Sequence, residues 1–91
     1  MGLYIASYDL HNQRTYQPVW DKLGSWGAVR LLESLWLVKS ALTASEIRDA
    51  LQAVAGSDDS VAVVELKAGC YWAATRAKQA GVDWLKKHIL G

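Results

Sequence analysis

Asp9 is the residue whose type and position point most clearly to chemistry. It stands near the end of an apolar stretch, Leu3 to Leu10, where a buried charge is costly unless it is paired or bound to a cation. Two interpretations stay open: a structural cap that accepts hydrogen bonds from the following loop amides, or a ligand for Mg²⁺ or Mn²⁺. One carboxylate is a poor metal site, but a twofold axis near Asp9 would bring two together.

Polar residues directly after Asp9 are auxiliary candidates. His11 and Asn12 begin the expected loop, and an imidazole there could act as a general base or donate a hydrogen bond to a phosphate. The alternative for His11 is a solvated surface residue. The single cysteine, Cys70, excludes an intrachain disulfide, a cysteine-built zinc site and a thiol redox pair, and it fits a small apolar role.

Cations for nucleic-acid binding are expected at strand ends and loops. The candidates are Arg14, Arg30, Lys39 and Lys67. Because 10 Lys and Arg oppose 9 Asp and Glu, the net charge is only +1 and gives no long-range positive field. Contact with nucleic acid therefore requires a fold that gathers these cations on one side, and the competing interpretation is ordinary solubilising charge.

The chain has 5 Trp and no Phe, so its large apolar volume must come from Trp and Tyr. Trp20 and Trp36 are expected in the core, and Trp84 is expected to pack the C-terminal segment. Trp26, beside Gly27, is the candidate for stacking on a base.

The first half of the chain predicts a strand, a helix and a further β segment. Leu3 to Leu10 is rich in aromatic and branched residues, which favours a strand. Thr15 is the expected cap of the helix, with Pro18 in its first turn and Gly24 and Gly27 at its end. The segment from Ala28 to Ser40 predicts either one bent strand or a hairpin that turns near Glu33 and Ser34.

The second half predicts a helix, a strand and a terminal helix. Thr43 and Glu46 form a capping box, and Gly56 stands where a left-handed residue would end the helix. Ser60 to Leu66 reads as a strand covered on both faces. Asp83 to Ile89 favours a helix, whereas Tyr71 to Ala80 fits either a helix or a connector.

This order of elements predicts an α+β fold, a ferredoxin-like βαββαβ sandwich with an additional C-terminal helix. We expect a single domain over residues 1–91, with its core in 3–66 and a C-terminal extension in 67–91. Two helices should cover one face of the sheet. The apolar run from Val61 to Val64 requires that the tail helix or a second copy of the chain covers the other face.

Three stretches carry a resemblance to a known family. They are Tyr4 to Leu10 (YIASYDL), Arg30 to Leu37 (RLLESLWL) and Asp58 to Val61 (DDSV). Together they resemble the small CRISPR-associated spacer-acquisition subunit, the family called Cas two. A looser set of phage and mobile-element relatives shares a tryptophan like Trp36 and a terminal segment like Val82 to Lys86.

The resemblance implies a ferredoxin-like homodimer in which the two copies of Asp9 face each other and nucleic acid is the substrate. It also implies an endonuclease activity dependent on Mg²⁺ or Mn²⁺, which not every member displays, and a bridging role beside an integrase-type partner. Family members commonly carry a second acidic or polar residue soon after the first Asp, and the corresponding stretch here, Leu10 to Arg14 (LHNQR), departs from that pattern in having no second acidic residue. Virulence-associated protein D, a ribonuclease toxin, shares the fold and the opening strand.

Three functions therefore stand side by side. The first is a CRISPR-associated type of homodimer that binds, bridges or cuts nucleic acid. The second is a noncatalytic dimerisation or protein-interaction module, and the third is a ribonuclease toxin. A lone cysteine fits a reducing cytoplasmic setting, and no run approaches the roughly 20 apolar residues needed to span a membrane.

Overall fold

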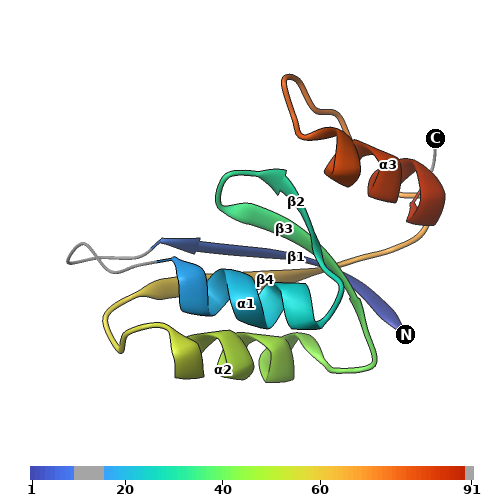
Figure 1. Ribbon diagram of the computed structural model, residues 1–91. Coiled ribbons are helices and arrows are strands. Elements are labelled where there is room, and N and C mark those ends of the chain that lie inside the picture. Colours follow the sequence, from blue (N-terminus) through green and yellow to red (C-terminus); the bar gives the residue numbers. More distant parts are fainter. Residues whose placement is uncertain (10–15, 90–91) are drawn as a thin grey trace.

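The computed structural model describes residues 1–9 and 16–89 and shows the predicted ferredoxin-like α+β fold, a βαββαβ unit followed by a C-terminal helix (Figure 1). The elements are β1 (Gly2–Asp9), α1 (Gln17–Ser25), β2 (Val29–Leu32), β3 (Leu35–Ser40), α2 (Ala44–Val54), β4 (Ser60–Leu66) and α3 (Gln79–His88). The four strands form one antiparallel sheet in the order β2-β3-β1-β4.

The two faces of the sheet follow from the alternation of side chains along β1. Tyr4, Ala6 and Tyr8 are buried against the layer formed by α1 and α2, which lies on one side of the sheet (Figure 1). The odd-numbered residues from Leu3 to Asp9 therefore point to the opposite side, here called the outer face. Helix α3 lies on that side of the molecule (Figure 1).

Helix α1 begins and ends differently from the sequence prediction. Thr15, the predicted cap, lies outside the described residues, and the N-cap position is Tyr16, which makes no side-chain capping hydrogen bond. Pro18 is in the first turn, as predicted. Gly24 was predicted to end the helix, but its backbone is helical and it lies within α1. Gly27, with a φ of 71°, takes the left-handed conformation just after the helix end.

The segment from Ala28 to Ser40 is a hairpin, the second of the two predicted alternatives. β2 and β3 are joined at Glu33 and Ser34, and the pairing register shifts between Arg30 and Leu32. The turn itself contains neither glycine nor proline.

The capping box at the start of α2 is confirmed. The Thr43 hydroxyl accepts a hydrogen bond from the Glu46 amide at 3.2 Å, and the Glu46 carboxylate accepts one from the Thr43 amide at 2.8 Å. The prediction for Gly56 was wrong, because its φ is not positive. The Asp59 carboxylate accepts a hydrogen bond from the Gly56 amide at 2.6 Å, so a side chain holds this turn in place of a left-handed residue.

Helix α3 starts at Gln79, four residues earlier than predicted, and residues 67–78 form an irregular connector. The Lys78 amide donates a hydrogen bond to the Leu31 carbonyl of β2 at 2.9 Å, which fixes the start of the helix. Trp84 and Leu85 pack with Leu37 of β3. The tail helix thus covers the half of the outer face formed by β2 and β3. No helix in the described part of the chain has the length and apolar character to cross a membrane.

Candidate functional site

Asp9 lies at the end of β1, opposite Ser60 of β4, with its side chain exposed on the outer face. Because it is a strand-end residue, it escapes the burial cost expected for a charge inside an apolar strand. A shallow hollow of about 130 Å³ surrounds it, with Ser7 and Ala62 among its lining residues. One carboxylate and two serine hydroxyls thus gather here, and hard cations prefer such oxygen donors.

One chain does not complete a metal site from the residues that the structure describes. Within residues 1–9 and 16–89, no group of three or more His, Cys, Asp or Glu side chains is placed to hold a metal ion. The oxygen chemistry at Asp9 suits Mg²⁺ or Mn²⁺, but the number of donors falls short. A metal site at Asp9 would require donors beyond those that the described residues of one chain place there. The auxiliary candidates His11 and Asn12, and the cation candidate Arg14, lie outside the described residues.

Two of the predicted cations, Lys39 and Lys67, lie at the other end of the sheet. Lys39 pairs in register with Leu3, and Lys67 follows Leu66, which also pairs with Leu3. Leu3 precedes Asp9 by six residues, which corresponds to about 20 Å along a strand. These lysines are therefore remote from Asp9 within one chain.

The end of the sheet that carries Lys39 and Lys67 is basic. Partial burial, and to a smaller degree the charges of Lys39 and Lys87, lower the pKa of His88. The Gly69 amide donates a hydrogen bond to the Ile89 carbonyl at 3.1 Å, which brings the segment after Lys67 to the end of α3. We call Lys39, Lys67, Lys87 and His88 the basic end.

Arg30, the remaining predicted cation, is held by aromatic rings. Its guanidinium carbon lies 4.4 Å from the centroid of the Trp20 ring and 4.7 Å from that of Trp36. It also forms an ion pair with Glu33 at 3.4 Å, and its side chain is only 23% exposed. Glu33 makes a second ion pair with Lys78 at 3.2 Å. Arg30 thus links the hairpin to α1.

The hydroxyl of Tyr8 organises the rings around Arg30. It accepts hydrogen bonds from the indole nitrogens of Trp20 at 2.7 Å and Trp36 at 3.2 Å, and it donates one to the Glu33 carbonyl at 3.3 Å. The ring of Tyr16 stacks on Trp20, with centroids 5.7 Å apart and an interplanar angle of 10°. The run Tyr16–Trp20–Arg30–Trp36 is here called the aromatic stack.

Sequence reasoning placed Trp20 and Trp36 in the core, but it did not find the aromatic stack. Tyr16 and Trp20 are four residues apart on consecutive turns, a signal that the sequence does contain. Arg30 and Trp36 are cross-strand partners, and this pairing depends on the hairpin register. Trp26, the residue predicted to be available for stacking, is instead partly buried against the core, with the Lys22 amine 5.5 Å from its ring.

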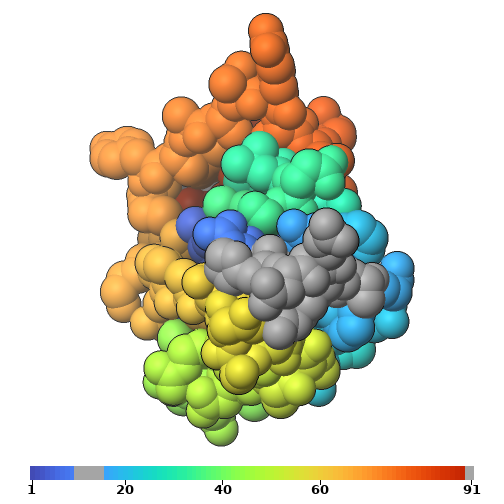
Figure 2. Space-filling view, turned by 90° about the vertical axis from the view of Figure 1, so that its left-hand side faces the viewer, coloured from blue at the N-terminus to red at the C-terminus, as the bar shows by residue number. Residues whose placement is uncertain are grey.

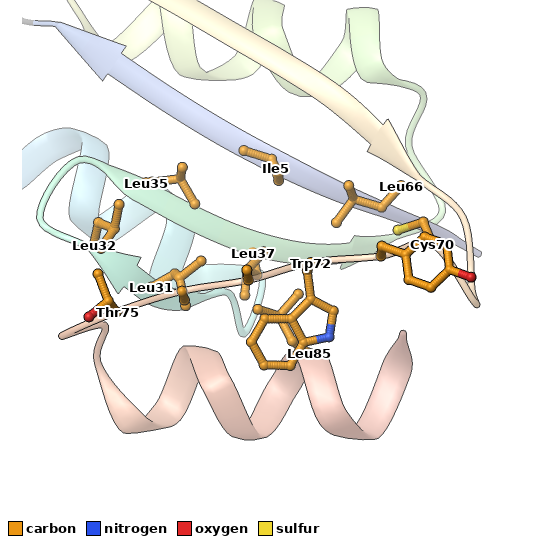
Figure 3. Close-up of a pocket in the computed structure, with 13 residues that line it drawn as sticks. Ile5, Leu31, Leu32, Leu35, Leu37, Leu66, Cys70, Trp72, Thr75 and Leu85 are labelled. Atoms are coloured by element: carbon orange, nitrogen blue, oxygen red, sulfur yellow. The ribbon is translucent and has the colours of Figure 1, made fainter. Parts of the chain in front are cut away.

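An apolar pocket of about 440 Å³ lies on the outer face, between the sheet and the connector (Figure 3). Aliphatic side chains of the sheet and of α3 form most of its wall, among them Ile5, Leu35, Leu37, Leu66 and Leu85. In Figure 2 a recess separates the orange connector from the blue end of β1. Among the described residues, no charged side chain lines this pocket, and its wall suits an apolar group.

No protein-family model matches the chain, and no solved structure matches it. Its geometry offers three features that bear on function: the hollow at Asp9, the basic end, and the aromatic stack. The hollow and the stack lie at the same end of the sheet, because Tyr8 and Asp9 are adjacent in β1. They lie on opposite faces.

Proposed function

We propose that the chain is a homodimeric nucleic-acid-binding protein of the CRISPR-associated type, with the two copies of Asp9 forming a site for Mg²⁺ or Mn²⁺. The observation that carries this proposal is the position of Asp9, exposed in a shallow hollow that Ser7 and Ser60 also line, on the half of the outer face that α3 does not cover. The sequence resemblance to the small spacer-acquisition subunit supports it.

The open half of the outer face supports the dimer. Val64 pairs in register with Ile5 and shares its face, and Val64 is 56% exposed. An apolar sheet surface of this kind is typical of a contact surface. In a twofold dimer the same patch lies on both sides of the interface, so an axis that passes near Asp9 joins the two carboxylates.

The chemistry follows from that pair of carboxylates. Asp9 from each protomer would hold the cation, with Ser7 and Ser60 lining the same hollow. A divalent ion there polarises a phosphoryl oxygen and lowers the pKa of a bound water, which suits hydrolysis of a phosphodiester. The basic ends lie about 20 Å from Asp9 in each protomer and would contact phosphates farther along the nucleic acid.

A cleavage assay with a matched control tests this function. Purified protein is incubated with DNA and with RNA in Mg²⁺ or Mn²⁺, and binding is measured on the same substrates. We expect Asp9→Asn and chelation each to abolish cleavage. The control Glu65→Gln, which makes the same charge change at an exposed position of β4, should cleave normally.

The other outcomes separate the remaining candidates. Binding without cleavage, unchanged by Asp9→Asn, would indicate a structural bridge, in which an integrase-type partner performs the chemistry. Cleavage restricted to RNA would indicate the ribonuclease-toxin alternative. A protein that binds neither DNA nor RNA would contradict the proposal.

The apolar pocket favours a second candidate, a noncatalytic protein-interaction module. Its volume of about 440 Å³ and its uncharged wall would accept large apolar side chains of a second protein. This candidate predicts normal dimerisation together with no affinity for nucleic acid.

A further inference from the structure

We propose that the aromatic stack is a nucleobase-binding platform, and that the protein therefore recognises unpaired bases of a single-stranded nucleic acid. This inference rests on the proposed function for the kind of ligand, and it adds the substrate class. The site consists of the exposed end of the stack at Tyr16 and the recess beside it.

The stack is built as a series of flat groups in contact. The Arg30 guanidinium lies within 5 Å of the ring centroids of both Trp20 and Trp36, and Trp20 in turn stacks on Tyr16 almost in parallel. Trp36 is buried, whereas Tyr16 is 41% exposed. The series is thus closed in the core and open at the surface, so a further flat ring can be added at Tyr16.

A recess next to Tyr16 has room and polar groups for a base. Its volume is about 130 Å³, and its lining residues are Tyr16, Trp20, Glu33 and Ser34. The carboxylate of Glu33 and the hydroxyl of Ser34 can form hydrogen bonds with the edge of a base. Arg30 and Lys78 pair with Glu33 and offset its negative charge, which lowers the repulsion of a nearby phosphate.

The platform is preorganised. Tyr8 bonds both indole nitrogens and the Glu33 carbonyl, so the two Trp rings are fixed before a ligand arrives. The Tyr16 ring lies against the rings of Trp20 and Tyr8, so ordering the platform costs little on binding. A paired base is already stacked within its duplex, so only an unpaired base can lie on Tyr16.

The test compares oligonucleotide binding by three variants. Fluorescence anisotropy of a short labelled oligothymidylate, which lacks duplex structure, gives the dissociation constant. We expect Tyr16→Ala to weaken binding by about 5- to 150-fold, the range for loss of one stacked base. Tyr16→Phe keeps the ring and should bind within about twofold of the original chain.

Tyr71→Ala is the matched control. Tyr71 is 98% exposed on the connector and lines the apolar pocket on the outer face, so its loss removes an exposed aromatic ring on the side of the sheet opposite to the stack. The Tyr71→Ala variant should bind the oligothymidylate with the same affinity as the original chain. Circular dichroism confirms that each variant is folded. Equal affinity of Tyr16→Ala and the original chain, or an equal loss in Tyr71→Ala, would overturn the platform.

Duplex DNA separates failure of this inference from failure of the proposed function. A chain that binds the duplex and not the single strand would overturn the platform and leave the nucleic-acid function intact. A chain that binds neither would overturn both. Binding of the single strand that depends on the Tyr16 ring supports the platform, whatever Asp9→Asn does to cleavage.

Discussion

At the scale of single residues, His88 gives the basic end a pH-dependent component. The Trp84 ring lies 4.8 Å from the imidazole, and partial burial is the larger cause of the lowered pKa, with Lys39 and Lys87 as smaller causes. In the folded chain the neutral imidazole is thus favoured relative to the unfolded chain, where the pKa is about 6.5.

The sign of the pH effect follows from this shift. Between the folded pKa of His88 and 6.5 the unfolded chain binds more protons, so stability falls as the pH drops through this window and levels off below it. We expect an NMR titration of the His88 ring to give a pKa below 6.5, and Lys39→Gln to raise it. A value of 6.5 or above would contradict the prediction.

Residue-scale patterns also explain which parts of the site could be predicted. Asp9 was identified because a carboxylate at the end of an apolar strand stands out in the sequence. The role of Arg30 was not predicted, because its contacts with Trp20 and Trp36 join two elements that are distant in sequence. Gly56 was misjudged because the Asp59 carboxylate, and not a left-handed backbone, holds its turn.

At the scale of elements, the close approach of α3 to β2 depends on Gly81. A Cβ atom at this position would lie 2.6 Å from the Cα of Leu31, which is backbone and cannot move aside cheaply. We expect Gly81→Ala to lower the free energy of unfolding by about 1–3 kcal/mol, measured by urea denaturation.

Gly24→Ala is the control for that substitution. Gly24 lies within α1 with a helical backbone, and a Cβ there would meet nothing within 4 Å. The added methyl group should raise the free energy of unfolding by about 0.4–1 kcal/mol, because alanine favours the helix and restricts the unfolded chain. Similar effects of the two substitutions would show that the contact with Leu31 is unimportant.

Elements with local signals were predicted well, and those set by tertiary contacts were not. The capping box at Thr43 fixed the start of α2, and the apolar run fixed β4 at Ser60–Leu66. The start of α3 depends on the hydrogen bond from Lys78 to Leu31, for which the local sequence carries no signal. The turn at Glu33 and Ser34 lacks glycine and proline, so the choice between a bent strand and a hairpin stayed open.

At the scale of the whole molecule, the outer face is unevenly covered, with α3 over β2 and β3 and an open half over β1 and β4. We expect the open half to mediate the dimer. Light scattering at micromolar concentration should give a mass near twice the 10.0 kDa of the chain, and Val64→Asp should reduce it to that of the monomer.

Val54→Asp is the matched control for the dimer. Val54 is 38% exposed on α2, in the helical layer on the other side of the sheet. The same apolar-to-acidic change there should leave the mass unchanged. A monomeric original chain, or an equal effect of both substitutions, would remove the basis for pairing two copies of Asp9.

The indole rings of Trp20 and Trp36, which share a contact with the Arg30 guanidinium, also report optically on tertiary structure. Arg30 belongs to the hairpin and Trp20 to α1, so the fixed environment of these indoles is lost when helix and hairpin separate. A loosened state that keeps its secondary structure would retain its far-ultraviolet circular dichroism and lose the near-ultraviolet bands of these rings. The chain thus carries its own probe for distinguishing a packed core from a molten one.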